Sequence, residues 1–232
     1  MQDRNYFLSY TIYGTKSAVI GLIAASLGIN REDDENLRQL DGLSFATRVD
    51  QKGSLLQDYH IAQKYKKNGD LDRNYVTNRY YLEDSVSVVA IGSEDDELMR
   101  KIDNALKKPY YAYFMGRRSC PVAYDFYIKN TDEDVISSII KLEWQAAKWY
   151  KKTFRHKDVI NLNGYCDYNL LENKNIKQRR DNVKSFSQKN RKFDYRFENR
   201  FDIKIKNDEY VAQSISTEHD VFMEIGGEDV SI

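Results

Sequence analysis

Four side chains that could carry acid–base chemistry lie close together in the chain: Asp58, Tyr59, His60 and Lys64. Side chains of these types could cleave RNA without a metal, because a base can activate the 2′-hydroxyl while an acid protonates the leaving 5′-oxygen. His60 is the best acid or base candidate, with Tyr59 and Lys64 in support. The alternative is a surface or packing histidine in a projecting segment, which is the commoner situation. The stretch therefore offers a hypothesis of ribonuclease activity.

A second group, Thr15, Lys16 and Ser17, stands at the expected start of a helix. Backbone N–H donors, a hydroxyl, an ammonium and the positive end of the helix dipole together suit a phosphate. The alternative is an ordinary capped core helix. A P-loop is excluded, since that motif needs glycine directly before the lysine and again five residues earlier, where this chain has Thr15 and Tyr10.

A third group, Gly116, Arg117, Arg118 and Ser119, is predicted to follow directly on a strand at 110–115. Two guanidiniums would then emerge at the edge of a sheet beside a glycine that lets another backbone approach. Arginine suits planar, bidentate contacts with phosphate. The alternative is a pair of exposed surface arginines.

Charge is segregated along the chain although the formal net charge is zero. Residues 141–206 carry 18 Lys and Arg against 8 Asp and Glu, whereas the last 26 residues contain seven acids and no Lys or Arg. A basic block between acidic ones fits a polyanionic partner, because each neutralised phosphate releases counterions. The alternative is a lysine-rich composition that only covers solvated surfaces.

No cofactor, metal or membrane is predicted. The two cysteines, Cys120 and Cys166, cannot form a structural zinc site alone, and no carboxylates have metal-ligand spacing. Nothing resembles a signal peptide or a transmembrane segment, so we expect a cytoplasmic protein with both thiols free.

Hydrophobic periodicity predicts the elements that must position these groups. Residues 14–29 predict a buried helix that begins at the N-cap Thr15 and stops at Gly28. The strand expected at 45–50 alternates, which places Ala46, Arg48 and Asp50 on its outward face. Further elements are a projecting hairpin at 51–79, strands at 80–91 and 110–115, and a helix from about 94 to 108.

This order of elements is that of a ferredoxin-like fold without its first strand, for which residues 1–13 are either a strand or a lead-in loop. The second part of the chain predicts a helix from about 131 to 150, a strand-like segment at 158–171, a basic loop at 173–190 and a hairpin at 193–205. The expected domains are 1–125, with the hairpin inside it, a smaller basic part at 126–206, and an acidic tail at 207–232 that could be mobile.

Five stretches, in this order and spacing, resemble the CasD family of CRISPR-associated proteins, the RAMP subunits of type I-E Cascade complexes. The stretches are GTKSAVIGLIAASLGI, FATRVDQKGSLLQDYH, YYLEDSVSVVAI, ALKKPYYAYFMGRRSCPVA and QRRDNVKSFSQKNRKFDYR. The resemblance covers about residues 10–200 and rests on the agreement of all five.

The resemblance implies an α+β protein: a ferredoxin-like (RRM/RAMP) domain with a projecting thumb β-hairpin and a smaller β-rich C-terminal part. Proteins of this family hold the 5′ handle of the guide RNA (crRNA), cap the filament of Cascade backbone subunits and contact the large subunit. They are not expected to act as isolated monomers. The resemblance carries RNA contact over to residues 15–17 and 116–119, and further to Arg48, Tyr59 and His60.

One departure from the family is expected. The family opens with a strand and a Gly-Pro-containing turn before the region that matches residues 1–13, and this chain lacks both. An unfilled position would leave an unpaired sheet edge, which favours aggregation.

Three functions remain open at this point. The first is a non-catalytic RNA-binding subunit in CRISPR antiviral defence. The second is an endoribonuclease that processes precursor crRNA without a metal, using Tyr59, His60 and Lys64. The third is a protein-interaction module that uses the acidic and basic surfaces.

Overall fold

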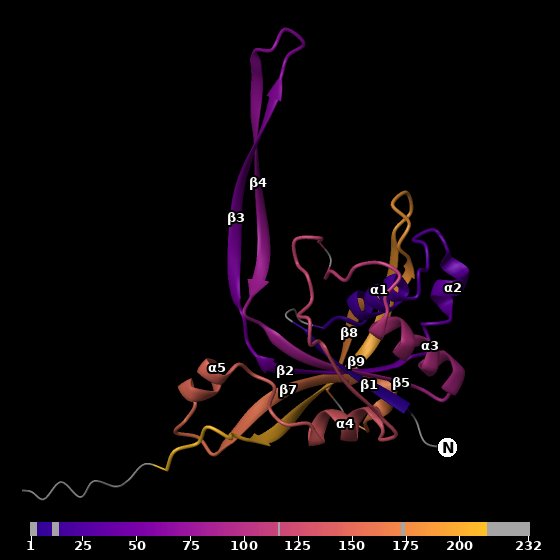
Figure 1. The fold of residues 1–232 in the computed structure, drawn as a ribbon, viewed down its shortest axis with the longest axis vertical. Helices are drawn as coiled ribbons and strands as arrows, with labels where there is room; N and C mark the ends of the chain where they lie inside the picture. Colours follow the sequence, from indigo (N-terminus) through magenta and orange to yellow (C-terminus); the bar gives the residue numbers. More distant parts are fainter. Residues whose placement is uncertain (1–3, 11–13, 116, 173–174, 213–232) are drawn as a thin grey trace, which may run out of the picture.

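The computed structural model describes residues 4–10, 14–115, 117–172 and 175–212, and for residues 4–10 the backbone alone (Figure 1). The strands are β1 (Arg4–Tyr10), β2 (Ser44–Gln51), β3 (Ser54–Tyr65), β4 (Leu71–Glu83), β5 (Val86–Ser93), β6 (Tyr127–Thr131), β7 (Val159–Asp167), β8 (Ile176–Ser185) and β9 (Lys192–Lys206). The helices are α1 (Lys16–Ser26), α2 (Asp34–Arg38), α3 (Asp96–Lys107), α4 (Val135–Lys141), α5 (Lys148–Thr153) and the short 3-10 helix η1 (Tyr168–Leu170).

Seven strands form one antiparallel sheet in the order β6-β1-β5-β2-β7-β9-β8. Its first four strands, together with α1 and α3, have the chain order and the spatial order of a ferredoxin-like fold, which confirms the predicted fold class. The remaining three strands extend this sheet, so the basic C-terminal part continues the same sheet through the pairing of β2 with β7.

The expected absence of the first strand is wrong. β1 pairs with β5 from Arg4 opposite Ser93 to Tyr10 opposite Ser87, and on its other side it pairs with β6. It therefore occupies the central position that the family pattern assigns to an opening strand. The irregular aromatic sequence of this segment is compatible with either a strand or a loop. Because β1 pairs on both sides, the unpaired sheet edge expected from its absence does not occur.

A hydrophobic core lies on each face of the sheet, and Figure 1 shows helices on both sides of it. Helices α1, α2 and α3 pack on one face, where Phe45 and Val89 are buried, and α4 packs on the other, where Ala46 and Val88 are buried. The predicted buried helix is confirmed as α1: Thr15 is its N-cap and accepts a hydrogen bond from the N–H of Ala18. None of the helices in the described ranges is long and apolar enough to cross a membrane.

Gly28 ends α1 as predicted, with a φ of +75° that favours glycine. The segment that follows α3 then seals this end of the helix. Tyr110 and Tyr111 donate their backbone N–H groups to the carbonyls of Ser26 and Ala25. The strand predicted at 110–115 is therefore wrong, because these backbone donors satisfy the end of a helix and not a neighbouring strand.

β2 is buried on both faces, so the prediction that Ala46, Arg48 and Asp50 point outward to solvent is wrong. The alternation is real, but α4 and the segment after it cover the second face. Arg48 is completely buried, and its guanidinium donates to the carbonyls of Ile139 and Leu142 at distances of 2.6 and 2.7 Å. These are carbonyls at the end of α4, which are left without partners inside the helix.

The single helix predicted to reach Tyr150 is accordingly divided into α4 and α5. Between them Trp144 donates its indole N–H to the carbonyl of Asp50 at 2.8 Å, and Gln145 donates its backbone N–H to the Asp50 carboxylate at 2.6 Å. Contacts to β2 thus hold this segment extended. The helix begins at the N-cap Asp134, three residues later than expected.

In the last part of the sheet two predictions are wrong. The basic segment expected to be a loop contains β8, and the expected hairpin at 193–205 is one 15-residue strand, β9. The aromatic and aliphatic residues from Phe193 to Ile205 occupy only odd positions, which is the pattern of an uninterrupted strand. β9 pairs with β7 along one half and with β8 along the other.

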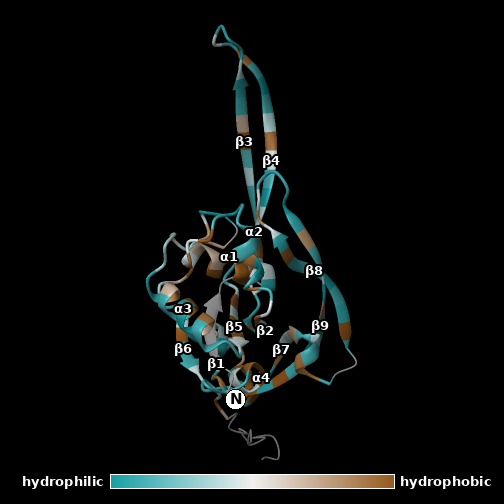
Figure 2. Cartoon of the chain, turned by 90° about the vertical axis from the view of Figure 1, so that its right-hand side faces the viewer, coloured by the Kyte–Doolittle hydropathy of each residue, from teal (hydrophilic) through white to brown (hydrophobic). Residues whose placement is uncertain are grey.

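β3 and β4 form a two-stranded hairpin that projects far from the sheet (Figures 1 and 2). Nearly all of its side chains are exposed, and its tip turns at Gly69, which has a φ of +90°, in the sequence Asn68-Gly69-Asp70, which is typical of hairpin turns. We call this hairpin, residues 54–83, the thumb. The strand predicted at 80–91 is divided at Asp84, whose φ of +53° separates the thumb from β5.

Candidate nucleic-acid interface

The N-terminus of α1 is already occupied by a carboxylate of the chain itself. Asp181 accepts hydrogen bonds from the backbone N–H groups of Lys16 at 2.8 Å and Ser17 at 3.0 Å, and also from the Ser17 hydroxyl. The ammonium of Lys16 donates to Asp167 at 2.9 Å. The donors that the sequence assigns to a phosphate therefore do hold an anion, which is supplied by β8.

A β-bulge places Asp181 there. Arg180 lies opposite Tyr195 and Asn182 lies opposite Asp194, so Asp181 is an extra residue in β8. A bulge re-aims the side chain that it adds. Asp181 is 3% exposed and points toward the start of α1.

Around Asp181 lies a network of ion pairs, most of them buried. The guanidinium of Arg196, on β9, contacts Asp167 at 3.2 Å, Asp181 at 3.2 Å and Glu198 at 3.0 Å. Arg179 adds a further pair with Glu198 at 3.1 Å. Three cations, counting Lys16, thus face three carboxylates, and the network holds β7, β8 and β9 against α1 with little net charge.

Sequence reasoning missed Asp167, Asp181 and Arg196. The partners of α1 lie about 150 to 165 positions further along the chain, and a bulge leaves no recognisable mark in a lysine-rich strand. The one available signal is the acidic residue inside a basic run at positions 177–184.

The loop after α3 brings Arg117 to the base of the thumb. Its guanidinium lies 4.9 Å from the centre of the Tyr81 ring, a cation–π arrangement. Hydrogen bonding with Arg117 lowers the pKa of the Tyr81 phenol below its usual value, and hydrogen bonding with Ser119 lowers it further. Figure 1 shows the loop between α1 and the base of the thumb. Arg118 is exposed beside them, and Gly116 lies outside the described residues.

The thumb holds the remaining predicted residues, and it does not bring them together. Tyr59 is 60% exposed and His60 is exposed too, but neighbouring residues of a strand point to opposite faces. His60 and Lys64 share a face at a separation of about 13 Å, from four steps of roughly 3.3 Å. Lys64 pairs with Asp72 at 3.2 Å. The three side chains cannot act on one phosphodiester in this arrangement, because acid–base catalysis needs hydrogen-bond reach.

Arg48 is not available to a ligand either. It is 0% exposed and forms a bidentate pair with Asp50, with distances of 2.6 and 2.7 Å. The RNA contact predicted for it does not fit this burial.

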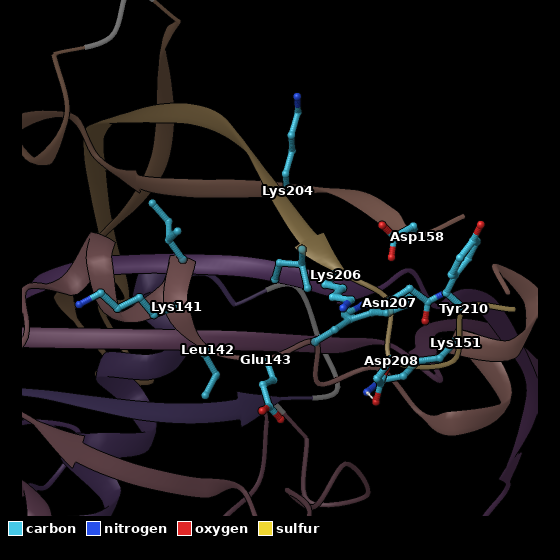
Figure 3. A pocket seen from close by; sticks show the side chains of 13 residues that line it. Lys141, Leu142, Glu143, Lys151, Asp158, Lys204, Lys206, Asn207, Asp208 and Tyr210 are labelled. Carbon is cyan, nitrogen blue, oxygen red and sulfur yellow. Dashed lines mark hydrogen bonds and ion pairs between the residues drawn. The ribbon is translucent and has the colours of Figure 1, made fainter. Parts of the chain in front are cut away.

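A hollow of about 910 Å³ lies on the other side of the molecule, between the end of α4 and the end of β9 (Figure 3). The charges around it include four ammoniums and three carboxylates, and one pair, Lys151 with Asp208, is in contact at 2.9 Å. None of these residues was predicted from the sequence to form a site.

Nowhere in the described ranges do three or more His, Cys, Asp or Glu side chains come together to hold a metal ion. Cys120 and Cys166 are both free thiols.

The sheet order and the projecting thumb define a ferredoxin-like protein of the RAMP type. Its family is shown by sequence as well: the chain belongs to the CRISPR-associated protein (Cas_Cas5) family, whose model matches residues 4–198.

Two kinds of relative agree with this assignment. The chain is 30% identical over 130 residues to the CRISPR system Cascade subunit CasD of Escherichia coli (strain K12). That match covers 50% of this chain and 58% of the relative, so it spans little more than half of the relative's length.

Solved structures match over nearly the whole chain. One, described as a CRISPR RNA-guided surveillance complex, has a TM-score of 0.67 at 19% identity and covers 95% of this chain and 99% of its own. Another, described as the crystal structure of a Cas protein, has a TM-score of 0.54 at 18% identity and covers 91% and 98%. At these identities the likeness shows the fold.

Proposed function

We propose that this protein is a non-catalytic subunit of a type I Cascade surveillance complex in CRISPR antiviral defence. In this role it binds the 5′ handle of crRNA, caps the filament of backbone subunits and contacts the large subunit in the cytoplasm. Membership of the Cas5 family carries the proposal. The relative that is a named Cascade subunit supports it.

The RNA contacts that we propose centre on the loop after α3. Arg117 and Ser119 sit at the base of the thumb against Tyr81, and Arg118 is exposed beside them. Guanidiniums held in this way can form charge-assisted hydrogen bonds with phosphates. Exposed Tyr59 and His60 would extend the contact along the thumb.

The N-terminus of α1 is a weaker candidate for RNA contact. A phosphate at Thr15, Lys16 and Ser17 would have to displace Asp181, which already receives hydrogen bonds from two of them. We therefore place the N-terminus of α1 second to the arginine loop.

Binding can be tested with crRNA that bears its own 5′ handle and with RNA whose handle is scrambled. Arg117→Ala should weaken binding of the native handle about 5- to 30-fold, which corresponds to roughly 1 to 2 kcal/mol for a charge-assisted hydrogen bond. Arg100→Ala is the matched control, because Arg100 is exposed on α3. Equal affinity for native and scrambled handles would disprove specific handle recognition.

The alternative function is a metal-independent endoribonuclease that processes precursor crRNA. Incubation of the protein with precursor RNA in EDTA separates the two. We expect no cleavage, because Tyr59, His60 and Lys64 are dispersed over two faces of the thumb. Cleavage in EDTA that His60→Ala abolishes would overturn the non-catalytic assignment.

A further inference from the structure

The ribbon formed by β8 and β9 presents exposed aromatic side chains on the face turned away from α1. Tyr195 is 56% exposed and Phe197 is 50% exposed. Arg196 and Glu198 alternate with them in β9 and enter the buried ion-pair network on the α1 side. The two rings therefore lie on the opposite face of the sheet from α1, with about 7 Å between them along the strand.

Each ring has a polar side chain directly across the ribbon. Arg180 pairs with Tyr195 and Gln178 pairs with Phe197, and cross-strand partners share one face. Tyr168, from η1, is 54% exposed and meets Phe197 edge to face, with 6.1 Å between the ring centres. We call these five residues the aromatic platform.

The backbone around the platform is anchored. Asn199 is fully buried and donates to the carbonyls of Tyr168 and Leu171 at 2.9 and 2.8 Å, which fixes η1 beside β9. On the other side of the ribbon, the Arg196 ion pairs hold β9 against β7 and β8. The exposed rings are therefore held on a rigid support and not on a loop (Figure 2, where β8 and β9 form the right-hand edge).

The composition of the platform suits unpaired nucleotides. Aromatic rings on the surface of an antiparallel sheet stack with single-stranded bases, and arginine adds a phosphate contact. The amide of Gln178 can donate and accept hydrogen bonds, as reading a base edge or a 2′-hydroxyl requires. The platform carries one positive charge, that of Arg180, and lies within residues 141–206, where 18 basic residues stand against 8 acidic ones; this part of the chain therefore attracts a polyanion.

We propose that the aromatic platform binds two unpaired nucleotides of single-stranded RNA, whose bases stack on Tyr195 and Phe197 while Arg180 contacts the phosphate between them. This site lies on the other face of the sheet from the arginine loop and α1. It goes beyond the proposed handle-binding function and does not depend on it.

Affinity for a 4-thiouridine RNA that lacks any handle sequence tests the platform in the full-length protein. The variant Tyr195→Leu/Phe197→Leu keeps apolar side chains but removes both π faces, and should bind at least about tenfold more weakly, since each stacked base contributes substantially. The swap Tyr195→Phe/Phe197→Tyr retains both rings and should bind like the unaltered protein. Trp149→Leu, which removes an aromatic side chain that is 56% exposed on α5, is the matched control.

Photocrosslinking locates the contact directly. Trypsin should release residues 193–196 and 197–200 as separate peptides, each containing one platform ring, and crosslinked nucleotides should appear on both. Unchanged affinity of the leucine variant, or crosslinks confined to other peptides, would overturn the proposal. DNA of the same sequence should bind more weakly, and equal binding of DNA would refute the assignment to RNA. Failure of handle recognition would leave these results unaffected.

Discussion

Replacing Arg48 with alanine should destabilise the protein strongly, because this buried guanidinium ties β2 to the end of α4. The alternation of the strand places Arg48 outward, and the family resemblance makes it an RNA contact, but the side chain is completely buried. Its guanidinium donates to both oxygens of Asp50 and to three carbonyls, those of Ile139, Leu142 and Glu143, at 2.6 to 2.8 Å. The contacts to Asp50 and to the carbonyl of Ile139 are buried, and those to the carbonyls of Leu142 and Glu143 are partly buried.

The loss of stability in Arg48→Ala can be estimated from the buried carboxylate of Asp50, which would remain without its partner. A buried pair broken on one side costs about 3 to 5 kcal/mol, because the remaining charge stays desolvated without a partner. For a chain of this length each kcal/mol lowers Tm by roughly 2 to 4 °C. We therefore expect Tm to fall by roughly 6 to 20 °C. The Tm of Arg48→Lys should lie between those of the unaltered protein and Arg48→Ala, since an ammonium retains the charge but cannot reach all five acceptors.

Thermal unfolding followed by circular dichroism measures the loss of stability. The affinity of each variant for crRNA, measured at a temperature where it remains folded, gives the second readout. Arg117→Ala should show the opposite pattern, with weakened RNA binding and little change in Tm. A folded Arg48→Ala protein with an unchanged Tm and weakened RNA binding would refute the structural role of Arg48. It would support the RNA contact that the family resemblance implies.

Three further outcomes are expected. Gly28→Ala should lower the free energy of unfolding by about 1 to 2 kcal/mol, because alanine is disfavoured at positive φ and its Cβ would lie 2.9 Å from the ring of Tyr110; chemical denaturation measures this. Asp84→Gly should raise it by up to about 1 kcal/mol by relieving a positive φ, and a decrease would show that Asp84 makes a compensating contact. Burial raises the pKa of the Cys166 thiol to about 12, so iodoacetamide at pH 8 should label Cys120 first, and Cys166 only on unfolding, as mass spectrometry can show.

Local signals in the sequence were sufficient for several elements. The N-cap Thr15 and the stop at Gly28 delimit α1 because both act within one turn of the helix. Gly69 defines the tip of the thumb for the same reason. The order of the predicted elements already indicated a ferredoxin-like fold with a projecting hairpin, and the family resemblance agreed with both. The sheet topology confirms the fold class.

The interior of the site could not be predicted, because it depends on contacts between distant segments. The alternation around Arg48 is that of a half-buried strand, and only the presence of α4 turns the outward face into a second core. Asp181 reaches α1 through a bulge, and bulges are not encoded by periodicity. The strand expected at 110–115 failed because its backbone donors are used to close α1.

The contact of Asp181 with the start of α1 also determines the order in which parts of the protein can fold during synthesis. During synthesis the first turn of α1 emerges 165 residues before the side chain that completes it. Until β8 has left the ribosome, the donors at Lys16 and Ser17 can be satisfied only by water or by another anion. Contacts this distant in sequence slow folding, because the chain must lose much of its freedom before they form. The docking of the C-terminal ribbon should therefore be a late step that locks a helix formed much earlier.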